Sequence, residues 1–409
     1  MTFPLTYDLV MSWDADLQAL TDRLAAPLFS RPEPRASFGD LVRALLSDVP
    51  RKNSWQLSDH IGHATANRFE HLLARAKWDL DRLRDEVRRY VVDHLAHPDA
   101  VLIADDTAAI KRGDMSAGVA RQYCGRTGQV ENCQVMPMLT YASAAGHTFI
   151  NRRLYLPETW TSEPARRARA HIPNQVTFAT KPQLVIAMLE EELADGTPFR
   201  YLCADSGYGR DPQLRAFCHQ RAIAYVMAVP VDLPLVALYS GGEPAGHVLD
   251  RLLAHAGPGL WKRRSCGQGS KGARLYDWCA TRVHLDGQEP APGHVHTLLI
   301  RRSVSSPGDI ELFLAHAIRG TTISTLISAA GMRWKIEENN EHGKDLLGLT
   351  EYQVRTWEGW HRHVTAVMLA LAFLTVTRSR LPDDDAPGQR DDQGKDQAHR
   401  TAPPAPASS

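Results

Sequence analysis

Three acidic residues could do chemistry because of where they lie in the sequence. Asp106 and Asp205 each follow a short apolar run, in VLIADDT and YLCADSGYG. Glu337 lies in a helix-like segment, RWKIEENNEHGK, four residues after Arg333 and seven before Lys344. Carboxylates that share a low-dielectric cleft repel one another, and hard divalent cations with oxygen ligands relieve that repulsion. Because Mg²⁺ typically combines a few carboxylates with substrate phosphates, these residues predict metal-assisted chemistry on a phosphodiester.

Nearby acids compete for each of these places. Asp105 directly precedes Asp106, and alternation along a strand turns neighbouring side chains to opposite faces, so we expect only one of them to face the cleft. On a helix, Glu341 shares a face with Glu337, whereas Glu338 lies about 100° round from it. A purely structural explanation also exists, because Asp after an apolar run often forms a turn and charged helices often carry surface ion pairs.

The overall charge neither excludes nor demands a nucleic-acid partner. A chain of 409 residues exceeds what one hydrophobic core usually supports, so we expect roughly two or three structural units. Equal numbers of acidic and basic residues are not typical of a protein that simply coats nucleic acid. Local basic clusters are nevertheless compatible with a positive DNA path. They are Arg51-Lys52, Arg152-Arg153, Arg166-Arg167 with Arg169, Lys262-Arg263-Arg264 and Arg301-Arg302.

Cysteine spacing and apolar segments indicate the compartment. The six cysteines form no C-x-x-C pair and no zinc-ribbon spacing. The first residues, MTFPLTYDLVMSW, lack the basic start and apolar core of a signal peptide. The longest apolar stretch, VTAVMLALAFLTV, is too short to span a bilayer comfortably and indicates a buried helix. We therefore expect a cytoplasmic protein with reduced thiols.

Hydrophobic periodicity divides the chain into five parts. Residues 1–98 carry apolar residues at helical spacing and predict a helical N-terminal domain. Residues 99–230 follow the order β-β-β-α-β-α-β, which predicts an α/β fold with a mixed sheet and helices packed against it. Residues 231–296, rich in Gly and Pro, predict a β-rich insertion before the helix of Glu337. Residues 297–381 resume the core, and 382–409 have the composition of a disordered tail.

The order of elements and the placement of the acids resemble the ribonuclease-H-like catalytic core shared by DDE transposases and retroviral integrases. In that family the first Asp lies on the first strand, the second on the fourth strand and the Glu on a later helix, as Asp106, Asp205 and Glu337 do here. The first Asp in the family usually directly precedes a Thr, which favours Asp106 over Asp105. Further similar stretches extend the resemblance over roughly residues 1–380. They are DDTAAIKRG, GVARQYCG, RRLYLPETW, ADSGYG, GSKGARLYDW and GLTEYQVRTWEGWHRH.

The helical segment is also similar to the Tyr-Arg-Glu-Lys signature, spaced Y-x2-R-x3-E-x6-K, of one group of bacterial insertion-sequence transposases. Arg333, Glu337 and Lys344 fit this spacing, and the lysine position selects Glu337 over Glu341. Ala330 occupies the place of the Tyr, which leaves the DNA contact of that Tyr unassigned. The resemblance implies that Arg333 and Lys344 flank the acid and contact DNA phosphates, which Arg can bind bidentately.

The resemblance implies a DNA transposase. Asp106, Asp205 and Glu337 would hold two Mg²⁺ or Mn²⁺ ions about 3.5–4 Å apart for phosphoryl transfer. Cleavage of double-stranded DNA at terminal inverted repeats would be followed by strand transfer into target DNA. Pairing of two ends implies a homodimer in the synaptic complex, associated with the bacterial nucleoid when bound to DNA. A metal-dependent nuclease without strand transfer and an inactive DNA-binding relative are the alternatives.

Two further regions are candidates for DNA contact. The N-terminal helices, together with Arg51 and Lys52, are candidates for recognising the element's ends, from position and helicity alone. The glycine-rich segment GQGSKGARLYDW carries Lys271 and Arg274, which could contact the DNA backbone, although a plain surface hairpin explains it equally well. This segment does not match the Walker pattern, so we do not expect nucleotide binding.

Overall fold

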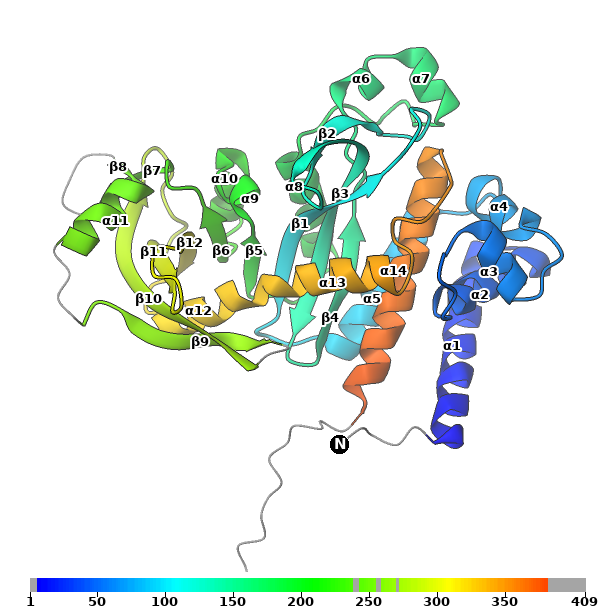
Figure 1. The fold of residues 1–409 in the computed structure, drawn as a ribbon, viewed down its shortest axis with the longest axis horizontal. Helices are drawn as coiled ribbons and strands as arrows, with labels where there is room; N and C mark the ends of the chain where they lie inside the picture. Colours follow the sequence, from blue (N-terminus) through cyan, green and yellow to red (C-terminus); the bar gives the residue numbers. More distant parts are fainter. Residues whose placement is uncertain (1–5, 238–242, 255–258, 270–271, 382–409) are drawn as a thin grey trace, which may run out of the picture.

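A broad sheet with helices packed on it forms most of the molecule, and a group of helices lies at one end (Figure 1). The structure is a computed structural model. It describes residues 6–237, 243–254, 259–269 and 272–381. The tail predicted over 382–409 lies outside the described residues, as does Lys271. The predicted α/β class with a mixed sheet and packed helices is confirmed.

Five helices make up the N-terminal part of the described chain. They are α1 (Tyr7–Leu28), α2 (Pro32–Leu45), α3 (Ser54–His60), α4 (Asn67–Ala74) and α5 (Leu80–Leu95). Short polar side chains cap three of them, because Thr6, Asn53 and Asp79 accept hydrogen bonds from amides of the first turn. Their apolar faces meet around fully buried rings, among them Phe38 and Phe69. The helices therefore share a core that amphipathic periodicity alone predicts.

Packing and a buried ion pair join these helices to the sheet. The mostly apolar α14 (Trp357–Ser379) contacts α2, α4, α5 and the strand β4 (Gly146–Arg152). Nε of Arg88 on α5 lies 3.0 Å from Oε1 of Glu192 on α8 (Lys181–Ala194), and both side chains are buried. The apolar run in the middle of α14 is indeed a buried helix. The division of the chain into five parts stays a prediction.

Twelve strands form one sheet within the described residues. Their order is β2-β3-β1-β5-β6-β12-β11-β10-β7-β8, with β4 also paired to β3 and β9 to β10. Their bounds are β1 (Val101–Ile110), β2 (Ala120–Cys124), β3 (Gln129–Ser143), β4 (Gly146–Arg152), β5 (Tyr201–Ala204), β6 (Tyr225–Val229), β7 (Pro234–Ala237), β8 (Glu243–Pro244), β9 (Lys262–Gly269), β10 (Gly272–Leu285), β11 (His294–Ser303) and β12 (Ile310–Ile318). Strands from the predicted insertion therefore extend the core sheet through β11 and β12.

The strand order β4-β3-β1-β5-β6 forms the part of the sheet that positions the acids. Strands β1, β5 and β6 run parallel, whereas β3 is antiparallel to both β1 and β4. A mixed sheet of this order, flanked by helices, fits the ribonuclease-H-like architecture that the resemblance implies. Two strands that the periodicity does not predict also join the sheet. The short β2 has an exposed, polar face that carries little apolar signal, and β12 pairs with β6.

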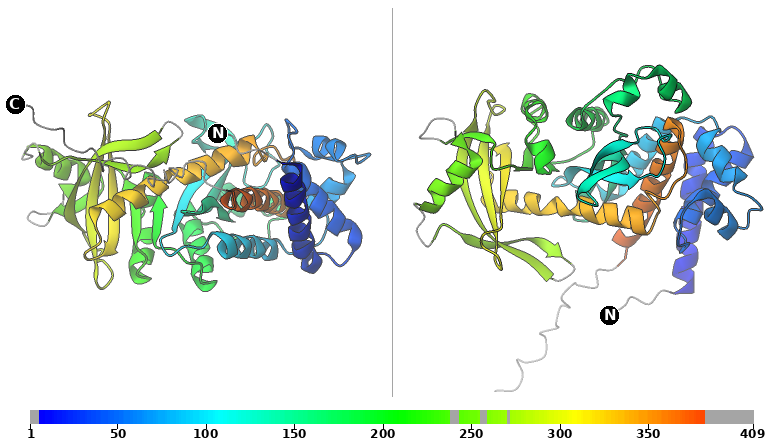
Figure 2. Two further views of the ribbon diagram at one scale, coloured as in Figure 1. Left: turned by 90° about the horizontal axis from the view of Figure 1, so that it is seen from below. Right: turned by 45° about the horizontal axis from the view of Figure 1, so that its top comes forward.

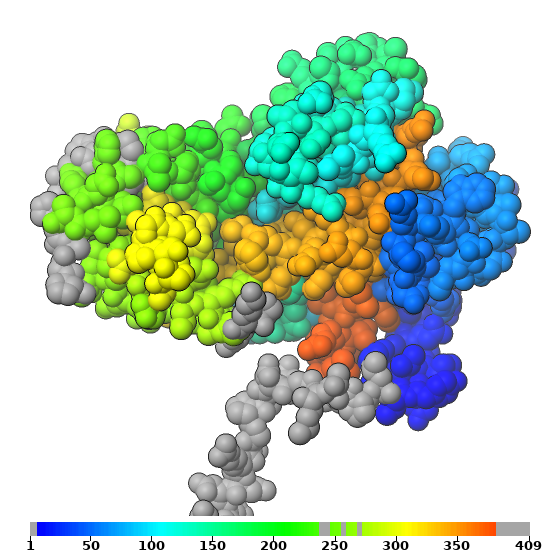
Figure 3. All heavy atoms as spheres, in the orientation of Figure 1, coloured from blue at the N-terminus to red at the C-terminus, as the bar shows by residue number. Residues whose placement is uncertain are grey.

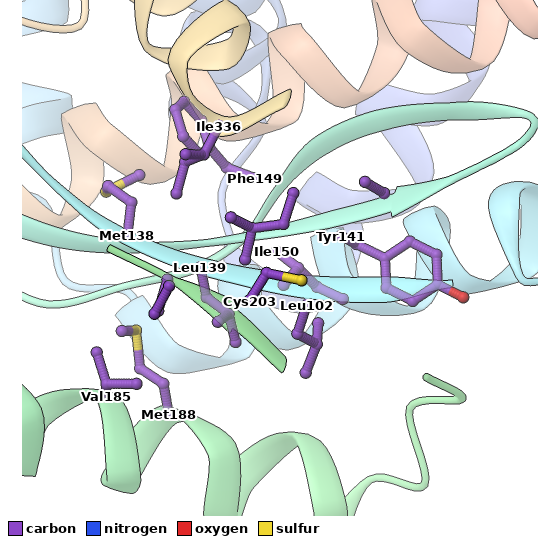
Figure 4. Close-up of a cluster of buried hydrophobic side chains, with 14 of the residues drawn as sticks. Leu102, Met138, Leu139, Tyr141, Phe149, Ile150, Val185, Met188, Cys203 and Ile336 are labelled. Atoms are coloured by element: carbon purple, nitrogen blue, oxygen red, sulfur yellow. The ribbon is translucent and has the colours of Figure 1, made fainter. Parts of the chain in front are cut away.

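Apolar side chains on both faces of the sheet hold the helices that flank it. Ile336 of α13 (Trp334–Asp345) and Val185 and Met188 of α8 are completely buried, and they lie on opposite sides of the strands (Figure 4). Helix α12 (Ile323–Met332) contacts β1, β5 and β6, and it leads directly into α13 along the sheet (Figure 2). Because α12 packs on the sheet and continues into α13, α13 is held over β1 and β3.

Shorter helices complete the described chain. They are α6 (Glu158–Thr161), α7 (Pro164–Arg169), α9 (Ser206–Gly209), α10 (Pro212–Gln220) and α11 (Ala245–Ala254). Helix α9 is a single turn that directly follows the end of β5. Among the described helices, none combines the length and the apolar character that crossing a membrane requires.

Candidate active site

One cavity of about 800 Å³ brings together the acids predicted from the sequence. Asp105 and Asp106 lie on β1, and Asp205 is the residue directly after β5. Glu337 lies in the first turn of α13. These elements lie far apart in the sequence and meet only because β1 and β5 pair while α13 crosses them. The fold therefore assembles the acids where the parallel pairing of β1 with β5 ends, with Asp105 and Asp106 inside β1 and Asp205 directly after β5.

The strand register explains why two aspartates are neighbours. In the parallel β1–β5 ladder, Ala104 lies opposite Ala204, so Asp105 and Asp205 are the next residues of the two strands. The ladder ends at this point, and no strand of the described residues pairs with that edge of β1 beyond it. Both Asp105 and Asp106 consequently line the cavity. The expectation from strand alternation that only one of them faces the cleft is wrong, because this edge of β1 is open beyond Ala104 within the described residues and both aspartates reach the cavity there.

Asp106 is held by two side chains that spacing in the sequence does not identify. Nζ of Lys181, at the start of α8, lies 2.6 Å from Oδ2 of Asp106. The hydroxyl of Tyr208 donates a hydrogen bond of 2.5 Å to Oδ1 of the same carboxylate. Tyr208 lies inside the ADSGYG motif, but nothing in the sequence around Lys181 points to the site. Both oxygens of Asp106 therefore have a partner in the protein.

Asp205 is fixed by the single turn of α9. Its Oδ1 accepts a hydrogen bond of 3.1 Å from the amide of Tyr208, so Asp205 is the N-cap of this turn. Gly209 allows the turn to approach β6, because a Cβ at this position would lie 1.9 Å from the carbonyl oxygen of Ala228. Asp205 thus caps α9 and lines the acidic cavity at the same time, so a structural role does not exclude a catalytic one.

The crowding of these acids changes their proton affinity. Burial, followed by the negative charge of Asp205, raises the pKa of Asp105 to about 7. Burial also raises the pKa of Asp205, and the charge of Asp106 adds to this effect. A carboxylate with a raised pKa is one whose charge lacks compensation. The inner end of the cavity therefore favours a bound cation.

One face of α13 forms the wall opposite the strands. Glu337, Asn340, Glu341, Lys344 and Asp345 line the cavity at the three-to-four spacing of a helix. Burial raises the pKa of the Glu337 carboxyl, and the charge and hydrogen bond of a neighbouring arginine act in the opposite direction. Asp345 was not predicted, although it continues the same face.

Glu338 points to a different environment from that of Glu337. Its carboxylate lies 2.8 Å from Nζ of Lys335, 3.1 Å from Nε2 of His147 and 3.3 Å from a guanidinium nitrogen of Arg274. Although burial acts against it, the hydrogen bond and charge of Lys335, followed by His147 and Arg274, lower the pKa of Glu338. Glu338 does not line the cavity. The geometry favours Glu337 over Glu338 and leaves Glu341 as a second acid on the cavity wall.

The four basic residues predicted to contact DNA occupy different places. Arg333 forms an ion pair of 3.1 Å with Glu337 and lines a smaller cavity of about 220 Å³ that shares Asp205. Lys344 lines the main cavity, and Arg274 lies over the ring of Trp334, 4.7 Å from its centroid. Lys271 lies outside the described residues. Arg333 and Lys344 therefore border the acids, whereas Arg274 packs against α13.

The donor set of the cavity suits a hard divalent cation. Six carboxylates and three basic side chains line it, and carboxylate oxygens are the ligands that Mg²⁺ and Mn²⁺ prefer. Among the described residues, no three acids or histidines lie close enough to hold one ion in their present positions. The Lys181 ammonium lies against Asp106 in this arrangement. The residues fit the metal by their chemistry, provided that Lys181 moves away from Asp106.

Comparison with known proteins gives two matches. Residues 25–275, more than half of the chain, match the family described as DDE superfamily endonuclease. This range includes both strand aspartates and ends before Glu337. The second match is the probable transposase for insertion sequence element IS701 of Microchaete diplosiphon, 26% identical over 165 residues. That alignment covers 40% of this chain and 40% of the relative.

The two matches agree with the resemblance that the motifs carry. The matched residues run from α1 into β10, so they contain the strands that hold Asp106 and Asp205 together with most of the predicted insertion. The convergence of Glu337 on the same cavity is independent of this match. On these grounds the chain belongs to the DDE superfamily endonucleases, as its sequence motifs predict.

Proposed function

We propose that this protein is a DNA transposase that cleaves DNA at the ends of an insertion sequence and joins the freed strand to target DNA. The observation that carries the proposal is the convergence of Asp106, Asp205 and Glu337 on one acidic cavity in a chain of the DDE endonuclease family. The similarity to a protein described as a probable transposase supports it. A metal-dependent nuclease without strand transfer remains the second candidate.

Asp106, Asp205 and Glu337 would hold two Mg²⁺ or Mn²⁺ ions, with Asp105 as the alternative to Asp106. When bound, the ions would activate water or a DNA 3′-hydroxyl and stabilise the leaving oxygen. Tyr208 orients the Asp106 carboxylate through its hydrogen bond. Arg333 plays the corresponding role for Glu337 through an ion pair between two partly buried side chains.

Lys344 is proposed to bind a DNA phosphate, since it lines the cavity and forms no ion pair within the described residues. Arg333 pairs with Glu337 and also lines the smaller cavity beside Asp205. Its guanidinium is therefore proposed to bind a second phosphate. Arg274, and Lys271 outside the described residues, are proposed as further DNA contacts. Phosphate contacts of this kind position the duplex and carry little sequence information.

The N-terminal helices are proposed to bind the DNA ends. A cavity of about 600 Å³ between α2 and α4 supports this, because Arg31, Arg68 and His71 line it together with Glu33. Cleavage and joining of two ends imply double-stranded DNA as partner and a homodimer in the synaptic complex. The proposed place of action is the bacterial cytoplasm, at the nucleoid.

The substitution Asp205→Asn tests the catalytic assignment. The variant should lose Mg²⁺-dependent cleavage of a duplex carrying the inverted repeats that flank the gene, while DNA binding in a gel-shift assay persists. Asp345→Asn is the matched control, because it removes the same charge from another residue of the cavity. Undiminished cleavage by Asp205→Asn would overturn the catalytic assignment of Asp205. An equal loss of cleavage in Asp345→Asn would show that the loss reflects the total charge of the cavity and not a specific role of Asp205.

A joining assay separates the two candidate functions. The wild-type protein is given pre-cleaved ends with a free 3′-hydroxyl and a supercoiled plasmid as target. A transposase produces plasmid joined to the labelled end, whereas a nuclease produces only shorter fragments. Joining that appears in the wild type and disappears in Asp205→Asn would support the first function at the proposed site.

A further inference from the structure

The β2–β3 hairpin forms one side of the mouth of the acidic cavity. Tyr123 at the end of β2, and Gly125 and Arg126 in the turn, line the cavity together with the acids. Tyr123 is 63% exposed, although aromatic side chains of this size are usually covered. Neither the predicted metal ligands nor the predicted phosphate contacts account for this exposed ring.

The hairpin is anchored firmly below the exposed ring. Cys124, Cys133, Val135 and Ala108 form a small buried cluster between β2, β3 and β1. Across the ladder Tyr123 lies opposite Val130, which is 54% exposed on the same face but does not line the cavity. The hairpin therefore fixes the backbone that carries Tyr123 and leaves its ring exposed to solvent.

Positive charge accompanies the aromatic ring. Arg126 forms no ion pair with any acid of the described chain, although six carboxylates line the same cavity. After burial, the nearby charge of Arg126 is the main cause that lowers the pKa of Lys344 on α13. Gly125 and Arg126 of the turn line the same cavity as Lys344, so the turn of the hairpin lies across the cavity mouth from α13. Figure 3 shows the β2–β3 region directly above α13 on this face of the molecule.

We infer that Tyr123 and Arg126 form a subsite for an unpaired nucleotide of the DNA strand that reacts at the acids. The ring of Tyr123 would stack on the base, and the Arg126 guanidinium would pair with a phosphate of the same strand. An exposed ring beside a free guanidinium is the combination by which proteins bind single-stranded nucleic acid. Holding the base outside the duplex would also expose the neighbouring phosphodiester to the carboxylates. The inference rests on the proposed function, because it places a DNA strand in this cavity.

A binding experiment tests the subsite without requiring cleavage. The full chain carrying Asp205→Asn is mixed, in Mg²⁺, with a duplex that has a short single-stranded 3′ extension and 2-aminopurine as the unpaired base. A blunt duplex of the same sequence is the reference probe. We expect tighter binding of the extended duplex and a fall in 2-aminopurine fluorescence, because stacking on an aromatic ring quenches this base.

Substitutions at the hairpin identify the group responsible. In the same background, Tyr123→Ala should weaken binding of the extended duplex at least about fivefold and abolish the quenching, whereas Tyr123→Phe should keep both. Val130→Ala, on the same face of the hairpin, should change neither. Arg126→Ala should weaken binding of the extended duplex and lower its salt dependence by about one ion.

The possible failures are distinguishable. No preference for the extended duplex, or quenching that survives Tyr123→Ala, would overturn the subsite even if the wild type cleaves and joins DNA. A preference that depends on Tyr123 in a protein without any cleavage or joining activity would support the subsite and contradict the proposed function. Equal effects of Tyr123→Ala and Val130→Ala would attribute the loss to the hairpin fold and would overturn the role of the ring.

Discussion

The ammonium group of Lys181 lies 2.6 Å from the carboxylate of Asp106. A cation of the protein therefore sits where the proposed function places a metal ion. Both side chains are only partly covered, so the ion pair has modest strength and can be replaced. Lys181 also starts α8, whose buried face packs on the sheet, which keeps its backbone close to the site when the ammonium moves.

The substitution Lys181→Met should strengthen binding of Mn²⁺. It removes the competing cation and keeps an unbranched side chain, so the apparent Kd should fall at least about fivefold, which corresponds to roughly 1 kcal/mol. Electron paramagnetic resonance of free Mn²⁺ measures this without DNA. Lys344→Met is the control, because Lys344 lines the same cavity without an ion pair in the described chain. An unchanged Kd, or the same gain in both variants, would contradict a direct competition at Asp106.

Substitution of the two neighbouring aspartates should separate their roles. Asp106→Asn should reduce Mg²⁺-dependent cleavage at least about 100-fold, since Tyr208 already orients this carboxylate. Asp105→Asn should retain most of the activity, because Oδ1 of Asp105 already accepts a hydrogen bond of 2.7 Å from the amide of Asp106. Cleavage rates, measured with melting temperatures to verify folding, decide between them. The reverse ranking would transfer the ligand role to Asp105.

Local patterns in the sequence predict the parts of this site that depend on local structure. The apolar runs before Asp106 and Asp205 form the segments of β1 and β5 that pair in parallel, and this pairing brings the residues that follow the two segments close together. The spacing of Glu337 and Lys344 becomes one face of α13 because a helix repeats every 3.6 residues. These two periodicities locate the acids before any contact is known.

The features of the site that the sequence did not predict depend on contacts between segments far apart in the chain. Lys181 reaches Asp106 across 75 residues, and only the packing of α8 against β3 brings them together. The cavity role of Tyr123 depends on the register between β2 and β3, and β2 has a polar face without a clear strand pattern. Alternation along β1 predicted that only one of Asp105 and Asp106 faces the cleft, but the ladder between β1 and β5 ends at Ala104 and both residues line the cavity beyond it.

A buried histidine cluster should make the fold less stable in mild acid. Nε2 of His296 lies 3.1 Å from Nε2 of His219, so only one of the two nitrogens can carry the shared proton. Burial lowers the pKa of His219 to about 4, of His296 to about 3 and of His316 to about 4. The unfolded chain, with pKa values near about 6.5, takes up protons first as the pH falls. The stabilising contribution is therefore present above about pH 6.5 and is lost toward pH 4.

The slope of stability against pH measures this contribution. Each histidine that stays neutral in the fold should lower the free energy of unfolding by about 1.4 kcal/mol per pH unit in this window. Urea unfolding between pH 7 and pH 4 should show a slope smaller by about this amount in His296→Gln than in the wild type. The exposed His60 supplies the control, His60→Gln. The carboxylates of the active site titrate in all three proteins, so their effect cancels, and identical slopes would contradict the prediction.

The junction between α5 and α8 should depend on the Arg88–Glu192 ion pair. Both side chains are buried and Nε lies 3.0 Å from Oε1, so Arg88→Met leaves a buried carboxylate without its cation. Urea unfolding should show a loss of about 3–5 kcal/mol. Adding Glu192→Gln should recover part of this loss, because the neutral amide no longer needs a counter-charge. Arg89→Met, which removes an exposed arginine paired with Glu86, should cost less than about 1 kcal/mol. Equal losses in both arginine variants would show that burial of the pair has no special role at this junction.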